Sequence, residues 1–226
     1  MAAAVAALPL HAGEVLLSED FESYASTAEI LDVTTGGWTA HGSNGGGMPP
    51  LLREASDRQF IEVSKDPRTG KLRNGFLTRT VPGLTEANTV RLKFRMLHGS
   101  EKTGQYAGLF DAERMKGYAV YWTAGEGPTT GVVRLLRFDA TSPVEWSDLG
   151  EEIGVVKNAD VHHIAREMPL AEFDLLLDLE SGEMTLAMDG QEKLSLRDPE
   201  PLRGLDQIVL RGNGGGFFDD LEVSSP

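Results

Sequence analysis

Residues 105–139 read QYAGLFDAERMKGYAVYWTAGEGPTTGVVRLLRFD, and this stretch decides the fold. Segments 105–111, 118–123 and 131–138 are rich in β-branched and aromatic residues, and a turn at 114–117 and a Gly/Pro/Thr loop separate them. These residue types favour strands, and the segments show no competing 3.6-residue periodicity. We therefore predict three consecutive antiparallel strands that form a β-meander.

Strand-like segments continue on both sides of this meander. The clearest is 89–97, where apolar and basic residues alternate strictly, as on a strand with one buried face. Its apolar set is Val90, Leu92, Phe94 and Met96, and its basic set is Arg91, Lys93 and Arg95. The other segments are 13–24, 60–64, 75–81, 173–180, 184–188, 191–196, 207–211 and 217–223, while 160–169 is ambiguous. The Asp189-Gly190 pair between two of them is typical of a hairpin turn.

The number of strands indicates two stacked sheets. About a dozen strands are expected, whereas a strongly twisted open sheet rarely exceeds about ten. We therefore predict an all-β fold, a two-sheet antiparallel β-sandwich. The predicted core includes Phe21, Phe94, Met96, Leu109, Val120, Leu175, Leu177 and Leu186.

Length and charge limit the class of protein. The chain has 226 residues, a usual length for one β-sandwich, and we expect a single domain over residues 13–226. A chain of this length buries a sizeable core without disulfides, and it contains no cysteine. It has 21 Lys and Arg against 35 Asp and Glu, and the net charge of −14 repels nucleic acids and anionic membrane surfaces. We therefore expect no nucleic-acid partner.

Residues 1–12 are apolar and have the length of a signal-peptide core. We expect a secretory signal cleaved after Ala12, which places the mature protein outside the cell or in the periplasm. The start lacks positive charge and Leu10 is large for its place before the cleavage site, so an Ala-rich start of a cytosolic protein is the alternative. No other apolar run reaches 18 residues, so no transmembrane segment is expected.

Four motifs in chain order carry a resemblance to a known family. They are the opening at 21–24, the Gly-Leu-Phe…Gly-Tyr-Ala-Val-Tyr pattern at 108–121, the Asp-Gly hairpin at 184–190 and the closing segment 218–223. In this order they resemble the laminin-G-like, concanavalin A-like lectin/glucanase proteins secreted by bacteria. The resemblance implies a jelly roll over nearly the whole mature chain. Because the family includes sugar-binding modules, glycosidases, polysaccharide lyases and adhesion domains, it leaves the function open.

The acidic strand of the family's glycosidases is incomplete in this chain. Those enzymes carry Glu-x-Asp-x-(x)-Glu, whereas Glu172-Phe-Asp174 is followed by Leu176 and Leu177. The pair at positions 178 and 180 has another interpretation, because two carboxylates about 6.5–7 Å apart along a strand fall in the range of inverting hydrolases. Asp178 and Glu180 are explained more simply as a solvated outer face.

A polysaccharide lyase would need a Tyr or His base beside a group that neutralises the substrate carboxylate. The candidate bases are Tyr106, Tyr118, Tyr121 and His98, and the candidate neutralisers are Arg91, Lys93 and Arg95. The family's lyase motifs Arg-x-Glu-x-Arg and Gln-Ile-His are not matched, since Lys93 replaces the Glu and Val209 replaces the His. His162 and His163 would point to opposite faces of a strand and could not share a metal ion.

We therefore predict an exported, non-catalytic carbohydrate-binding or adhesion-type module that binds a polysaccharide or glycan. Aromatic rings stack on sugar rings, and arginines donate hydrogen bonds to hydroxyl groups. The predicted sugar-binding residues are Arg91, Arg95, Tyr118, Tyr121, Trp122 and Trp146. The alternatives are a lyase or hydrolase of the same fold and a structural surface domain that binds no glycan.

The two ends of the chain predict a structural Ca²⁺ site. The resemblance implies an ion held by an Asp before the closing strand and by groups near the opening strand, and Asp219 and Glu22 match these positions. The loop 45–47 would add carbonyl oxygens, because calcium takes six to eight oxygen ligands. Independently of the family, the acidic segments 19–22 and 219–222 would repel each other as neighbours, and a divalent cation would remove that repulsion. Asp220 is excluded because it should point the other way along the strand.

Overall fold

The computed structural model describes residues 13–42, 49–55, 57–63, 74–98, 104–114, 116–124, 130–139, 150–160, 170–213 and 216–226. The strands are β1 (Glu14–Glu19), β2 (Thr39–Gly42), β3 (Leu51–Ala55), β4 (Arg58–Val63), β5 (Asn74–Thr80), β6 (Thr89–His98), β7 (Gln105–Phe110), β8 (Gly117–Ala124), β9 (Thr130–Phe138), β10 (Glu151–Asp160), β11 (Ala171–Asp178), β12 (Glu183–Met188), β13 (Gln191–Arg197), β14 (Gln207–Asn213) and β15 (Gly216–Ser225). The helical segments are α1 (Thr27–Leu31) and the 3-10 turn η1 (Leu84–Glu86). Within the described residues, no helix has the length and apolar character needed to cross a membrane.

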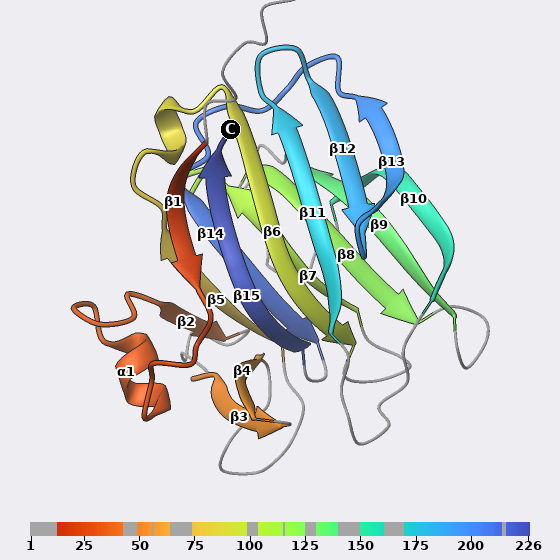
Figure 1. Cartoon of the computed structure of the whole chain (residues 1–226). Coiled ribbons are helices and arrows are strands. Elements are labelled where there is room, and N and C mark those ends of the chain that lie inside the picture. The colour runs from red at the N-terminus through yellow and green to blue at the C-terminus, as the bar shows by residue number, and fades with distance from the viewer. Residues whose placement is uncertain are drawn as a thin grey trace, which may run out of the picture.

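The strands form two antiparallel sheets that lie one behind the other in Figure 1. Sheet A, in front, has the order β13-β12-β11-β6-β15-β4-β3, and β1 also pairs with β15. Sheet B, behind, has the order β10-β9-β8-β7-β14-β5-β2. The meander predicted from residues 105–139 is β7, β8 and β9, which pair in sequence. The predicted all-β, two-sheet antiparallel sandwich is confirmed.

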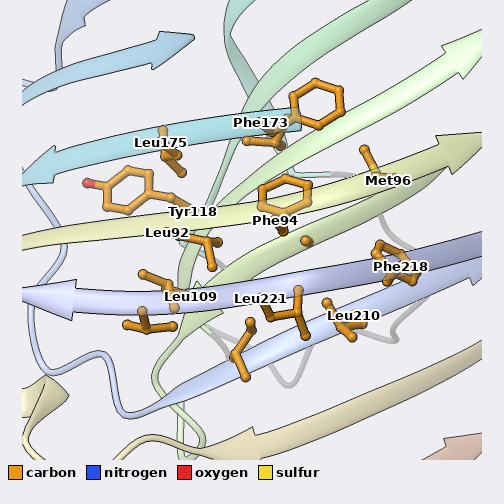
Figure 2. Close-up of a cluster of buried hydrophobic side chains, with 14 of the residues drawn as sticks. Leu92, Phe94, Met96, Leu109, Tyr118, Phe173, Leu175, Leu210, Phe218 and Leu221 are labelled. Carbon is orange, nitrogen blue, oxygen red and sulfur yellow. The ribbon is translucent and has the colours of Figure 1, made fainter. Parts of the chain in front are cut away.

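A continuous apolar core fills the space between the sheets (Figure 2). Every predicted core residue is at most 1% exposed. The rings of Phe94 on β6 and Phe173 on β11 stack with their centroids 5.2 Å apart. Alternate residues of β6 and β11 enter this core, because successive strand residues point to opposite faces. Each large apolar side chain buried in this way contributes about 1.5–3 kcal/mol to folding.

The last strand has an irregular point in sheet A. One side of β15 pairs with β6, and its other side pairs with β4 over 216–218 and with β1 over 221–225. Asp219 and Asp220 therefore lie between the partners β4 and β1. The register with β6 shifts at the same place, and Asp220 has a positive φ of 47°. This bulge interrupts the alternation of side chains along β15.

Three strands and one strand end differ from the sequence-based expectation. β2 and β3 are short strands at the sheet edges, and β10 has two register shifts that break the alternation on which the prediction rests. The first strand was expected to continue to residue 24, but β1 ends at Glu19 and Phe21 adopts a positive φ of 57°. Phe21 is still fully buried, because this turn directs its ring into the core.

Sheet B also carries an apolar cluster on its outer face, the face turned away from sheet A. On β7, Ala107 and Leu109 belong to the core between the sheets, so Tyr106 and Phe110 point to the outer face. All six residues of β7 are buried, so this strand is covered on both faces. The outer-face cluster comprises Phe76, Tyr106, Phe110, Ala119, Leu136, Phe138 and Val209, with Tyr121 packed against it.

Candidate functional site

The predicted sugar-binding residues do not form one site. Arg91 and Arg95 lie on the outer face of sheet A, where acidic side chains from neighbouring strands occupy their guanidinium groups. Arg91 Nε donates to Asp174 Oδ1 at 2.8 Å, and Arg95 lies 3.1 Å from Asp220 Oδ2. The interaction with Asp174 also raises the pKa of Arg91. These two arginines therefore belong to an ordinary pattern of cross-strand charge pairs.

Tyr118 and Trp122 lie in the sandwich core and are not available to stack on a sugar. Both are 0% exposed, and Figure 2 shows Tyr118 among the core side chains. Their position on β8 gives them the inward parity, because Val120 between them also faces the core. The two residues therefore belong to the core rather than to a platform. Trp146 lies outside the described residues.

Tyr118 has a structural role instead. Its hydroxyl donates to Asp198 Oδ2 at 2.6 Å and accepts the backbone N–H of Leu202 at 2.8 Å. Arg137 Nε donates to the same Asp198 oxygen at 2.8 Å. Burial and the hydrogen bond to Asp198 raise the pKa of Tyr118, so its hydroxyl stays protonated. This group holds the connection between β13 and β14 against the end of the core.

Tyr121 is the one described member of the predicted set on the outer face of sheet B, and the strand register places it in a row of aromatic and basic side chains. Directly opposed residues run across six strands, from β2 through β5, β14, β7 and β8 to β9. We call this set the transverse row. Its members are His41, Phe76, Arg211, Tyr106, Tyr121 and Arg134.

Arg211 occupies the middle of the transverse row. Its guanidinium carbon lies 5.5 Å from the ring centre of Phe76 and 5.6 Å from that of Tyr106, so it has an aromatic neighbour on each adjacent strand. Only 4% of the residue is exposed. Burial raises the pKa of Tyr106, and the charge of Arg211 opposes this shift. Tyr106 is therefore a neutral phenol at physiological pH.

The part of the row nearest to β9 is more accessible. Tyr121 is half-buried, and Arg134 donates to Glu152 Oε2 at 2.8 Å and to Thr123 Oγ1 at 3.0 Å. Burial raises the pKa of Tyr121, while the charges of Arg211 and Arg134 lower it. The Tyr121 ring lies against Gly104, where a Cβ atom would overlap the phenol. Glycine at position 104 therefore permits the position of this ring.

The other end of the row carries a histidine. His41 on β2 is half-buried, and its Nε2 lies 3.0 Å from Thr78 Oγ1. Burial lowers its pKa below 6.5, so the imidazole is neutral at pH 7. The transverse row thus combines aromatic rings, a neutral imidazole and two guanidinium groups on one sheet face. The sequence contained part of this signal, since alternation puts Tyr106 on the opposite side of β7 from Ala107 and Tyr121 on the opposite side of β8 from Val120. The strand register then brings the two tyrosines to one sheet face.

The candidate catalytic groups are not assembled. Asp178 ends β11 and accepts the backbone N–H groups of Glu180 and Ser181 at 2.9 Å, and these hydrogen bonds lower its pKa. Because Glu180 lies beyond the strand, the spacing argument for an inverting acid pair does not hold. Glu172 and Asp174 lie on the outer face of sheet A, where they are opposed to the basic residues of β6.

The predicted lyase groups are divided between the two sheets. Arg91, Lys93 and Arg95 are on sheet A, whereas the outward-facing tyrosines Tyr106 and Tyr121 are on sheet B. His98 ends β6, also in sheet A. His162 and His163 lie outside the described residues. The neutralisers and bases suggested by the sequence therefore do not meet. The arginines beside the outward-facing tyrosines are Arg211 and Arg134, which sequence reasoning missed.

The predicted calcium ligands Asp219 and Glu22 lie near the side chain of Arg58 or the backbone next to it. Asp219 is fully buried, and Arg58 Nη2 lies 3.0 Å from its Oδ2 and 2.7 Å from Asp220 Oδ2. The expectation that Asp220 points away from Asp219 is wrong, because the bulge in β15 lets both carboxylates reach the same guanidinium. Glu22 accepts the backbone N–H of Gln59, next to Arg58, at 2.9 Å. The loop 45–47 lies outside the described residues.

The electrostatics at Asp219 reflect crowding of negative charge. Burial, and then the charge of Asp220, raise its pKa to about 7, while Arg58 opposes the shift. Its Oδ2 is buried and has no hydrogen-bond partner, although the guanidinium of Arg58 lies close. In the described part of the chain, no group of three or more His, Cys, Asp or Glu side chains is arranged to hold a metal ion.

Several solved structures share this fold. A sialidase has a TM-score of 0.59 at 11% identity and covers 94% of this chain, which spans only 19% of the sialidase. The carbohydrate recognition domain of Emp47p has a TM-score of 0.56 at 13% identity, with 84% of this chain and 88% of that domain covered. A third structure is domain 4 of AbnA, a GH43 extracellular arabinanase from Geobacillus stearothermophilus, in complex with arabinotriose. Its TM-score is 0.54 at 13% identity, with 94% of this chain and 93% of that domain covered.

The sequence comparisons add no family. No protein-family model matches the chain, and no curated protein sequence matches it. At identities of 11–13% the structural likeness shows a common lectin-like β-sandwich fold. The finer assignment to the laminin-G-like proteins stays a prediction.

Proposed function

We propose that this protein is a non-catalytic carbohydrate-binding or adhesion-type module whose glycan binds along the transverse row of sheet B. The observation that carries the proposal is the row itself, because it places the half-buried Tyr121 ring on the same sheet face as Arg134, Arg211 and His41. Rings of this kind stack on sugars, and the polar groups bind hydroxyl groups. The carbohydrate recognition domain of Emp47p and the arabinotriose complex of AbnA domain 4 support a carbohydrate ligand on this fold.

The protonation of the tyrosines supports binding rather than catalysis. A lyase base must accept a proton from the sugar ring. The pKa values of Tyr106 and Tyr121 are both raised, mainly by burial, so their phenols donate hydrogen bonds at neutral pH and do not accept protons. Hydrolysis would need two carboxyl groups at a suitable separation, and the acidic residues of β11 face the other side of the sandwich.

A glycan array tests the proposed function. We expect wild-type protein to bind at least one polysaccharide class, with at least about tenfold weaker binding for Tyr121→Ala. The matched control is Arg91→Gln, which removes a guanidinium from the outer face of sheet A and should leave binding unchanged. Loss of binding in the control instead would move the site to sheet A. An absorbance rise at 235 nm would show a lyase, and release of reducing ends without that rise would show a hydrolase. If the protein neither binds nor cleaves any glycan, it is a structural domain.

Export is part of this proposal. Residues 1–12 lie outside the described residues, and their apolar composition is the support for a secretory signal. The test is to express the full chain in a bacterial host and to sequence the N-terminus of the protein recovered outside the cytoplasm. A mature protein that begins at Gly13 supports export, and protein retained in the cytoplasm with an intact N-terminus contradicts it.

We also propose that Ca²⁺ binds at Asp219 in competition with Arg58. The support is the buried Oδ2 of Asp219, which lacks a hydrogen-bond donor, together with the nearby carboxylates of Asp220 and Glu22. Arg58 now supplies the positive charge, so an ion would enter only when this side chain, 41% exposed, turns away. Calcium binding requires ionised carboxylates, and it should therefore strengthen as the pH rises through about 7.

Thermal melts of Arg58→Gln test the calcium proposal. Because the competing guanidinium is removed, excess calcium should raise the melting midpoint of this variant at pH 8 more than that of wild type, relative to EDTA. Arg53→Gln is the matched control, since Arg53 forms a similar ion pair in sheet A with Glu62 rather than with Asp219. If calcium leaves the midpoint of Arg58→Gln unchanged, no calcium site exists there.

A further inference from the structure

The transverse row has a buried positive charge at its centre. Arg211 is the only basic residue among the buried residues of the described chain. The strand register determines its neighbours, because Arg211 is opposed to Phe76 on β5 and to Tyr106 on β7. Both rings lie within 5.6 Å of the guanidinium carbon, so aromatic atoms line its flanks. The environment excludes water from much of the charge.

Among the described arginines that are buried or half-buried, Arg211 is the one with no anionic partner in the described part of the chain. Arg58, Arg79, Arg91, Arg95, Arg134 and Arg137 each have a carboxylate oxygen within 3.1 Å. The described residues provide no hydrogen bond or ion pair to the guanidinium of Arg211, and its Nε is buried without an acceptor. Its guanidinium lies over the rings of Phe76 and Tyr106. A buried polar group usually has a partner, so this exception needs an explanation.

The chemistry of arginine leaves few explanations. A buried lysine or histidine can lose its proton, but a guanidinium stays charged at every physiological pH. Contacts with aromatic faces offset part of the desolvation, by about 0.5–2 kcal/mol per cation–π pair. They do not satisfy the N–H groups, which remain directed donors. A planar carboxylate matches the guanidinium in charge and in geometry, because it accepts two parallel hydrogen bonds.

We propose that the transverse row binds a glycan that carries a carboxylate, such as a uronic acid, and that Arg211 binds this group. This inference rests on the proposed function and names its ligand class. The Tyr121 phenol, which stays protonated, donates to the same sugar from the next strand but one. Arg134 does not add a second free charge, since Glu152 occupies it at 2.8 Å. The site therefore fits one monoanionic sugar.

The net charge of the chain restricts the ligand further. At −14, the protein repels densely charged polymers at long range, and salt screens this repulsion over about 8–10 Å. A contact with a buried guanidinium is screened much less. Short uronate oligomers, or polymers in which charged and neutral sugars alternate, should therefore bind better than a fully charged polymer. Binding to a fully charged polymer should strengthen as salt is added, in contrast to ordinary ion-pair binding.

The test uses the full chain and trisaccharides of galacturonate, glucuronate, mannuronate and guluronate, each with its methyl ester. The ester keeps the sugar and removes only the charge. We expect at least one acid to bind at least about tenfold more tightly than its ester by calorimetry, since loss of a charge-assisted contact has that effect. Arg211→Lys keeps the charge without the planar fork and should weaken binding about tenfold. Arg211→Met should abolish it, and Arg91→Gln should bind like wild type.

Stability separates a binding role of Arg211 from a structural one. If the guanidinium serves to bind a ligand, it is an uncompensated buried charge in the ligand-free protein. Arg211→Met removes this charge, so the melting midpoint of the variant without ligand should be about 2–4 °C above that of wild type. A midpoint lowered by several degrees would overturn the inference, because Arg211 would then support the fold. The same measurements are made with a sulfated galactose trisaccharide. If this sugar binds and no uronate does, the inference that the ligand carries a carboxylate is overturned.

The outcomes for the two proposals are distinct. Equal binding of acid and ester that persists in Arg211→Lys would overturn the carboxylate inference and leave the carbohydrate-binding module intact. Failure of every charged and neutral glycan to bind wild-type protein would overturn both. Binding of an acid that is insensitive to Arg211→Met but lost in Tyr121→Ala would keep the row as the site and remove Arg211 from it.

Discussion

The outer faces of the two sheets are built in opposite ways. On sheet A, Arg91 and Arg95 are opposed to acidic side chains and are half-exposed, so each charge is neutralised within the protein. On sheet B, Arg211 is buried between two aromatic rings, and none of the described carboxylates forms an ion pair with it. A charge that the protein neutralises itself indicates an ordinary surface, whereas a buried charge without a partner indicates a site. This difference supports the proposal that the ligand binds at sheet B.

The largest effect should come from the aromatic cluster on sheet B. Phe110 is 1% exposed and packs on Phe138 and Tyr106, with ring centroids 5.1 Å and 6.1 Å away. We expect Phe110→Ala to lower the free energy of unfolding by about 3–5 kcal/mol in urea denaturation, because it leaves a cavity. Lys93→Ala, on the outer face of sheet A, should change it by less than about 1 kcal/mol. Similar small values at both positions would mean that sheet B has no second packed face.

The next effect concerns Asp219 and pH. Its folded-state pKa of about 7 is above its ordinary value of 3.8, so the folded state holds this proton more tightly than the unfolded state. The stability that this adds is complete below about pH 4 and is lost as the pH rises through about 7. We expect wild type to lose on the order of 1–3 kcal/mol between pH 5 and pH 8 relative to Asp219→Asn.

Urea melts of both proteins without calcium, at four pH values between 5 and 8, check this sign. A difference between the two proteins that stays constant over the range would show that Asp219 is ionised throughout. Asp178→Asn is a useful comparison, because hydrogen bonds lower the pKa of Asp178 and its effect should appear only in acid.

The smallest effect is expected for the ion pair of Arg91 and Asp174. The two groups are 41% and 21% exposed, and solvent screens their attraction. A double-mutant cycle with Arg91→Gln and Asp174→Asn should give a coupling of about 0.2–1 kcal/mol, and glycan binding should stay unchanged in all four proteins. A coupling of several kcal/mol, or a loss of binding, would remove the contrast between the two faces.

Local pattern was sufficient for most of the fold. The alternation in 89–97 predicted which face of β6 is buried. Successive side chains of a strand point to opposite faces, so the apolar set faces the core when the basic set faces the solvent. The Asp189-Gly190 pair has the two positive φ angles, 50° and 73°, that a tight hairpin requires. The missed strand β10 shows the limit of this reasoning, since its two register shifts break the period of two. Bulges depend on the neighbouring strand and are invisible in the pattern of one strand.

The candidate site could not be predicted from local pattern, because it depends on which residues of other strands lie next to each side chain. Local alternation and composition were enough to predict that residues 89–97 carry a basic row and that the chain is an acidic all-β sandwich. Only the tertiary structure decided that Tyr118 and Trp122 face the core, that Arg58 reaches both Asp219 and Asp220 at a bulge, and that Arg211 lies between Phe76 and Tyr106. The reason is physical: alternation specifies two faces, but which face is inside, and whether a charge meets its counter-charge, is set by strands distant in sequence.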